Sequence, residues 1–201
     1  PGSGAAPGSA GSGVLLLARA DRQQAYVGQQ VTVEYDLAYR SWLENVGFKE
    51  VPSFSGFWNK ELFTAQTLQQ HREVIEGVAY NVAPLKRVAL FPTAAGPQHL
   101  DPMVVSCQVP LRQGRRGSLL DEFGFGRPTE TLLVRSGGLD VRILPLPEAG
   151  RPAGFSGAVG RYSLAVQASP TTVPVGDPVT LRVDLSGTGN LSAVGPLELQ
   201  L

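Results

Sequence analysis

Residues 27–37 read VGQQVTVEYDL, and this stretch decides the fold. From Val31 to Leu37 apolar and polar side chains alternate, which is the period-2 pattern of a strand with one buried face. The pattern returns at residues 175–185 as VGDPVTLRVDL, 148 positions later and with six identical residues. A strand segment repeated at one offset predicts two related β-sandwich modules in tandem.

Strand-like segments extend on both sides of the first copy. Residues 62–70 alone have modest helical character, which Thr64 and Thr67 weaken. Glu76-Gly77 and residues 136–138 (Ser-Gly-Gly) have the composition of hairpin turns, because glycine adopts positive φ readily. The predicted fold class is all-β: an immunoglobulin-like β-sandwich domain followed by the first strands of a second, related sandwich module. Further strands are expected over residues 14–20, 47–52, 68–75, 78–91, 98–109, 132–134 and 139–144.

Composition divides the chain into four parts. Residues 1–13 contain only Gly, Pro, Ser and Ala, which predicts a flexible linker. The first sandwich domain is expected over residues 14–147, with a long loop at 111–130, and a Pro-rich linker follows at 148–152. Residues 153–201 make up about half of the ~100 residues that an immunoglobulin-type sandwich needs. We therefore expect the second module to be incomplete within this sequence.

Charge and reactive residues argue against several classes of function. The 201 residues carry 17 basic and 17 acidic groups, so no net field attracts nucleic acid. His71 and His99 fall on different predicted strands, and the single cysteine, Cys107, follows apolar residues as a buried thiol would. The sequence thus predicts no enzyme, no cofactor and no metal site. Met103 is the only methionine, so we expect the chain to be part of a longer one.

Aromatic residues concentrate between positions 48 and 63, which hold five of the fifteen aromatics in the chain. Pro, Ser and Gly interrupt this segment, as is typical of a loop or a sheet edge. Aromatic side chains carry much of the binding energy of protein interfaces, so Phe54, Phe57 and Trp58 are predicted to bind a partner. The alternative is that Phe54 and Trp58 fill the end of the sandwich as core residues.

A second candidate surface is the arginine-bearing stretch at residues 112–127, RQGRRGSLLDEFGFGR. Arg115, Arg116, Phe123 and Phe125 are its predicted partner-binding residues. A loop of this length in a compact domain is usually either functional or mobile, and both interpretations stay open.

Several longer strings resemble a known family. Residues 52–58 read PSFSGFW, residues 72–96 contain REV and LKRVALFPTAAG, and residues 154–191 contain GFSGAVG, VGDPVT and SGTGNL. In this order and spacing they resemble the BatD family of bacterial aerotolerance (oxygen-tolerance) proteins. The resemblance implies tandem immunoglobulin-like domains on the periplasmic side of the cytoplasmic membrane, with a cleaved signal and a membrane span outside these residues. It also implies partners with von Willebrand A-type domains, and it supplies no catalytic residues. If such partners bind through a metal-dependent site, Asp121 and Glu122 could complete the coordination of the ion, since hard cations prefer oxygen ligands; the alternative is that they are solvated loop acids.

The function expected from these observations is that of a non-catalytic, protein-binding module of the cell envelope. By the resemblance, binding to von Willebrand A-type proteins would connect it to aerotolerance or envelope stress. The alternative is a glycan-binding β-sandwich module, because sandwich domains also present aromatic platforms to sugars.

Overall fold

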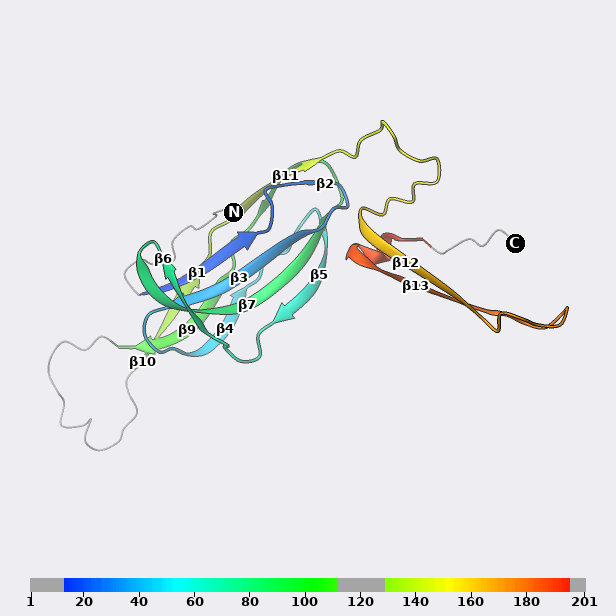
Figure 1. Cartoon of the computed structure of the whole chain (residues 1–201). Coiled ribbons are helices and arrows are strands. Elements are labelled where there is room, and N and C mark those ends of the chain that lie inside the picture. Colours follow the sequence, from blue (N-terminus) through cyan, green and yellow to red (C-terminus); the bar gives the residue numbers. More distant parts are fainter. Residues whose placement is uncertain (1–12, 112–128, 196–201) are drawn as a thin grey trace.

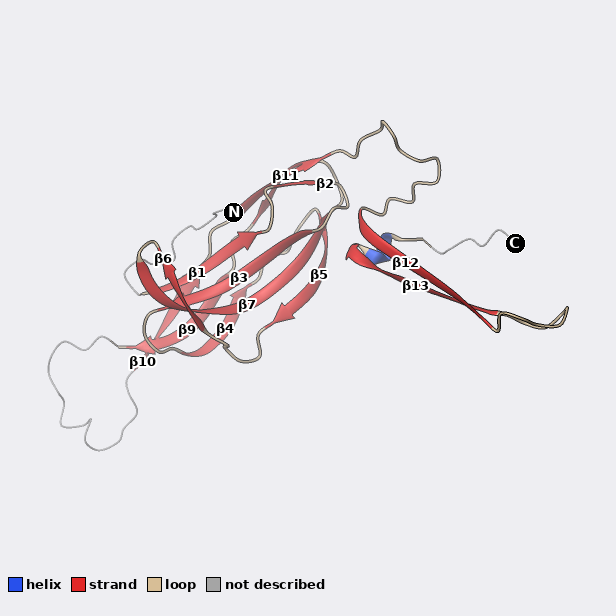
Figure 2. Ribbon diagram, viewed as in Figure 1, coloured by secondary structure: helices blue, strands red, loops and turns tan. Residues whose placement is uncertain are grey.

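The computed structural model describes residues 13–111 and 129–195. Its regular structure is nearly all strand, and the one helical element among these residues is the short 3-10 turn η2 (Leu191–Ala193) (Figure 2). The prediction of an all-β sandwich is confirmed. That the sandwich is of the immunoglobulin type stays a prediction.

Strands β1 to β11 form three sheets, and β12 and β13 form a separate hairpin (Figure 1). The largest sheet has the order β1-β3-β7-β5, and β6 also pairs with β7. The two smaller sheets have the orders β10-β9-β4 and β2-β11-β8. In chain order the strands are β1 (Val14–Ala20), β2 (Gln24–Tyr26), β3 (Val31–Tyr39), β4 (Glu44–Glu50), β5 (Phe57–Thr64), β6 (His71–Ile75), β7 (Val78–Pro92), β8 (Gly96–Leu100), β9 (Val104–Pro110), β10 (Thr129–Arg135), β11 (Leu139–Leu144), β12 (Gly160–Ser169) and β13 (Thr180–Gly189).

The core lies between the large sheet and the two smaller ones. Alternation along β3 places four side chains on its inner face, and all four are buried, as the sequence pattern predicts. Facing them are buried residues of β9, β10 and β11 in the same apolar cluster. The cluster therefore joins the sheets into one sandwich. Its members include Val31, Val33, Tyr35 and Leu37 from β3, and Val105, Cys107, Val134, Val141 and Ile143 from the strands opposite.

Of the two predicted hairpin turns, one is confirmed and the other is wrong. Glu76 and Gly77 have φ values of 50° and 79° and join β6 to β7 as a hairpin, as predicted. The prediction of a hairpin at residues 136–138 is wrong, because β10 and β11 belong to different sheets. There the Ser136 hydroxyl accepts a hydrogen bond from the Met103 N–H at 2.9 Å, and the Ser136 N–H donates to the Met103 carbonyl at 2.9 Å. The segment thus crosses between sheets instead of reversing within one.

The strands expected at 47–52, 68–75 and 132–134 are found as β4, β6 and β10, with different bounds, and three other expected elements also change. Residues 98–109 form two strands in different sheets, β8 and β9, separated by residues 101–103. Pro102 in this break has no N–H to donate to a neighbouring strand, which weakens pairing there. Residues 62–70 are not helical, since β5 extends to Thr64. The loop expected at 111–130 ends earlier, because β10 begins at Thr129. Residues 1–12 of the predicted linker lie outside the described residues.

The sequence repeat extends to the pairing of the strands. In the first module Leu16 of β1 lies opposite Leu37 of β3. Leu164 and Leu185 stand 148 positions after these two leucines, and they lie opposite each other in the β12–β13 hairpin. The burial differs: Leu16 is 0% exposed and Leu164 is 57% exposed. The hairpin thus repeats the β1–β3 pair, with its apolar face uncovered by any described residue. A second, incomplete sandwich at 153–201 stays a prediction that this register supports.

Candidate functional site

The aromatic segment of residues 48–63 folds into two strands at sheet edges. Among the described residues, β4 pairs only with β9, and β5 pairs only with β7. The outer side of each strand therefore carries backbone N–H and C=O groups that no neighbouring strand uses. We call this surface the β4–β5 edge. It comprises residues 44–50 and 57–64.

The structure separates the aromatic residues of this segment by their burial. Phe54 and Phe57 belong to the apolar core, so they are unable to anchor a partner as the sequence analysis proposed. Trp58 is 42% exposed, and Phe63 and Phe48 are exposed to a similar extent. The core alternative is thus correct for Phe54 and wrong for Trp58. Of the three predicted anchors, only Trp58 reaches the surface.

A tight turn explains why neighbouring rings point in opposite directions. Phe54 has a φ of 52° and Gly56 a φ of 82°, and the Phe57 N–H donates a hydrogen bond to the Phe54 carbonyl at 3.0 Å. This turn starts β5 with Phe57 on the inner face, opposite Pro92 of β7. Successive strand residues face opposite sides, so Trp58 lies on the outer face.

Trp58 is held in place by a second aromatic ring. Its ring centroid lies 5.3 Å from that of Phe91 on β7, with an interplanar angle of 48°. Phe91 is buried, so it provides a firm support for the indole. An anchor side chain that is already ordered loses less entropy when a partner binds. One side of the Trp58 ring is thus supported while a large part of the ring stays exposed.

Charged side chains link β4, β5 and β7 next to these rings. The Lys86 ammonium pairs with the Glu61 carboxylate, donates to the Thr64 hydroxyl at 3.0 Å, and lies 5.9 Å from the ring centroid of Phe48. The hydrogen bond from Lys86, followed by that from Thr64, lowers the pKa of Glu61. Lys86 thus ties both edge strands to the centre of the large sheet.

A small pocket opens beside this cluster, between β4 and the chain that follows β5. It has a volume of about 260 Å³. Leu43, Val46 and Phe48 line it from the β4 side, and Leu68 and Leu85 complete its apolar wall. The volume is near the lower limit of ~300 Å³ for small-molecule sites. A single side chain of a partner would suit it better than a separate ligand.

The second predicted surface lies outside the described residues. Arg115, Arg116, Phe123 and Phe125 all belong to residues 112–128, as do Asp121 and Glu122. The strands on either side of this segment are described: Pro110 at the end of β9 lies opposite Thr129 at the start of β10.

The candidate reactive residues His71, His99 and Cys107 lie in three different sheets. His71 on β6 lies 3.4 Å from the Glu73 carboxylate, and His99 on β8 lies 2.7 Å from that of Asp140. Cys107 is buried in β9, and burial raises the pKa of its thiol, which disfavours the reactive thiolate. Within residues 13–111 and 129–195, no three His, Cys, Asp or Glu side chains gather closely enough to hold a metal ion.

The pair between His99 and Asp140 gives a prediction about titration. The hydrogen bond that the His99 ring donates to Asp140 raises the pKa of His99; burial opposes this effect, and the negative charges of Asp140 and then Asp101 add to it. Since the folded state holds the proton more tightly, the pair stabilises the fold below the ordinary histidine pKa. This stabilisation is lost as the pH rises through the raised value.

We expect Asp140→Asn to lower the pKa of His99 toward its ordinary value, measured by NMR titration of the imidazole Cε1 proton. Asp101→Asn is the matched control and should lower it less. An equal effect of the two substitutions would contradict the assignment of Asp140 as the main cause.

Besides the short strand β2, sequence reasoning missed two features of the molecule. The first is β5, which was expected as a loop or edge without strand bounds, because its exposed residues do not need to alternate. The second is β12, whose position follows from moving residues 14–20 by the repeat offset of 148.

In the described parts of the chain, no helix is long and apolar enough to cross a membrane. Comparison of the chain with protein-family models, curated proteins and solved structures returns no match.

Proposed function

We propose that this chain is a non-catalytic, protein-binding module of the cell envelope, and that the β4–β5 edge is its binding surface. The observation that carries this proposal is Trp58: a large, exposed ring, supported by Phe91, on a strand with one unpaired side. A strand of another protein could add to such an edge through backbone hydrogen bonds, while pockets and rings beside it select side chains. The proposal excludes Phe54 and Phe57, which lie in the core.

A strand added to β5 would find the most regular backbone near the start of β5. The register of β5 against β7 shifts between Glu61 and Phe63, which marks an irregularity in the strand. Irregular and charged edges resist unselective pairing with other chains. The regular part of the edge is therefore residues 57–61, with Trp58 on its outer face.

By the resemblance to the BatD family, the proposed partner has a von Willebrand A-type domain, and the proposed location is the periplasmic side of the cytoplasmic membrane. The exposed aromatic side chains support binding of a protein. A sugar-binding function has one observation in its favour: the side of the Trp58 ring away from Phe91 could stack on a sugar. Pelleting with peptidoglycan that depends on Trp58 would favour that alternative.

The test is binding of the 201-residue chain to a purified von Willebrand A-type domain identified by mass spectrometry among envelope proteins that co-purify with it. We expect Trp58→Ala to weaken binding about tenfold or more, which is typical of an interface anchor. Leu133→Ala is the matched control, because Leu133 is also an exposed apolar residue but lies on β10.

Hydrogen exchange gives the second measurement for this proposal. If a strand adds to β5, the backbone amides of residues 57–61 should exchange more slowly in the complex than in the free chain. Unchanged affinity of the Trp58 variant, together with unchanged exchange at these amides, would show that the β4–β5 edge is not the binding surface.

A further inference from the structure

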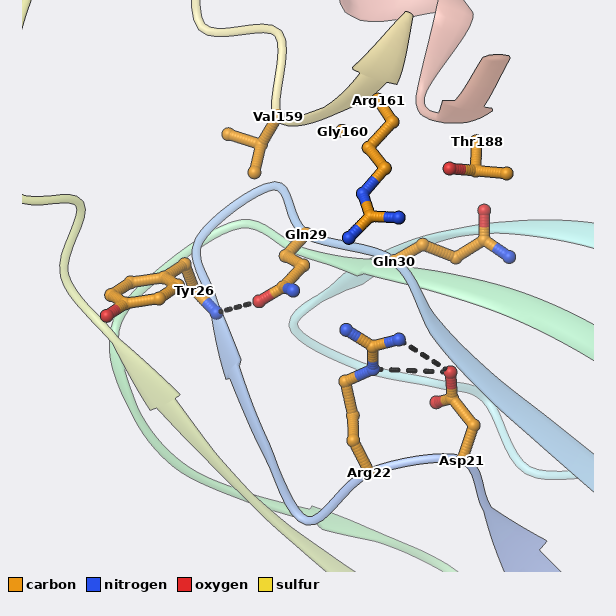
Figure 3. A pocket seen from close by; sticks show the side chains of 9 residues that line it. All are labelled: Asp21, Arg22, Tyr26, Gln29, Gln30, Val159, Gly160, Arg161 and Thr188. Carbon is orange, nitrogen blue, oxygen red and sulfur yellow. Dashed lines mark hydrogen bonds and ion pairs between the residues drawn. The ribbon is translucent and has the colours of Figure 1, made fainter.

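A second, larger pocket lies where the β12–β13 hairpin meets the first module (Figure 3). Its volume is about 690 Å³, within the range of ~300–1,000 Å³ found for small-molecule sites. Arg22, Tyr26 and Gln29 line it from the chain between β1 and β3, and Arg161 and Thr188 line it from the hairpin. The site thus needs both modules and is distinct from the β4–β5 edge.

The carboxylate of this pocket and one of its amide oxygens are already occupied. One carboxylate oxygen of Asp21 accepts from the Arg22 guanidinium at 2.9 and 3.2 Å, and the other accepts from the Thr32 N–H at 2.8 Å. The amide oxygen of Gln29 accepts from the Tyr26 N–H at 2.9 Å. The groups left to bind a ligand include four donors: the Gln29 amide nitrogen, the Thr188 hydroxyl and the two guanidinium groups. The amide nitrogen of Gln30 donates to the Thr32 hydroxyl at 3.1 Å, so Gln30 offers its amide oxygen.

The charges in the pocket do not balance. The guanidinium groups of Arg22 and Arg161 point toward the same space from opposite sides (Figure 3). Asp21 compensates Arg22, but no carboxylate in the described part of the chain pairs with Arg161. Two cations that face each other repel, and an anion between them converts this repulsion into attraction on both sides. The free charge and the free donors therefore favour the same class of ligand.

We propose that this pocket binds an oxyanion carried by a sugar, either a sugar carboxylate or a sugar phosphate. The anionic group would lie between Arg22 and Arg161, because guanidinium groups pair with carboxylate and phosphate through two parallel hydrogen bonds. Tyr26 is 39% exposed, and its ring lies at the edge of the pocket, beyond Gln29 and directed away from the two guanidinium groups (Figure 3), so only the end of a sugar distant from the anionic group would reach it. The amide of Gln29 and the hydroxyl of Thr188 would donate to the sugar oxygens.

The test is an NMR titration of the 201-residue chain with glucuronate, with glucose 1-phosphate, and with neutral glucose. We expect saturable shifts of the amide resonances around residues 22, 29 and 161 with at least one of the two acids, and none with glucose. The relative affinities of glucuronate and glucose 1-phosphate then decide between carboxylate and phosphate.

Arg161→Gln should weaken binding about tenfold or more, as expected when a charged hydrogen bond is lost. Arg182→Gln is the matched control, because Arg182 is an exposed arginine of the same hairpin that pairs with Asp184 instead. Trp58→Ala should leave this affinity unchanged, so the result is independent of the proposed protein interface. Equal binding of glucose, equal losses in the Arg161 and Arg182 variants, or the absence of saturable binding by both acids would overturn the proposal.

Discussion

Replacing Phe57 with alanine is expected to lower the free energy of unfolding by about 3–5 kcal/mol, the usual cost of removing a buried phenylalanine ring. The ring belongs to the core cluster and is 8% exposed. Its removal leaves a cavity beneath β5 that the neighbouring side chains fill only in part. Denaturant unfolding, followed by circular dichroism, measures this loss.

Trp58→Ala is the matched comparison, one residue further along the same strand. It removes the contact with Phe91 and uncovers that ring, and we expect a cost of about 1 kcal/mol, the size of one aromatic pair. If both substitutions cost the same, the indole would have to be part of the core and the proposed binding surface would be wrong. A double substitution of Phe57 and Trp58 does not test binding, because the loss of Phe57 alone destabilises β5.

Leu16→Ala should also be severely destabilising, by about 2–5 kcal/mol, because the leucine is completely buried between the sheets. Leu164 occupies the equivalent position in the second copy, opposite an equivalent leucine. Since its side chain is more than half exposed, Leu164→Ala should change the free energy of unfolding by no more than about 0.5 kcal/mol.

Denaturant unfolding of the two variants, compared with the unsubstituted chain, measures this difference between the copies. Both substitutions are Leu→Ala and both positions lie in paired strands, so a change in strand propensity affects the two variants equally. A large cost at Leu164 would mean that the apolar face of the hairpin is covered in solution.

The buried face of the sandwich could be predicted from the sequence because burial imposes a pattern. The alternation from Val31 to Leu37 gives both the strand and its inner side, and the structure confirms both. The bounds predicted for residues 14–20 and 139–144 agree with β1 and β11. In β11 one side is covered, so polar residues are tolerated only on the other. β1 is buried on both sides, because Leu17 packs with Ala38 and Val82 in a second apolar cluster, and its sequence is a continuous apolar run instead.

The site could be predicted only as a segment. β5 is exposed on both sides over most of its length, so nothing in its sequence fixes which residues face inward. Which side chains of β5 face inward is set by the pairing of Phe57 with Pro92 of β7, about 35 residues further along the chain. The pocket beside Arg161 has even less local signal, because its two sides come from the two copies of the repeat.

The length of β7 has a consequence for how the first module comes apart. Its fifteen residues pair with β3, β5 and β6, so three of the four pairings in the large sheet include this strand. Removing β7 would separate β3, β5 and β6 from one another and leave only the β1–β3 pair, whereas loss of an edge strand such as β5 leaves the other pairings in place. The stability of the large sheet should therefore depend more on β7 than on any other strand.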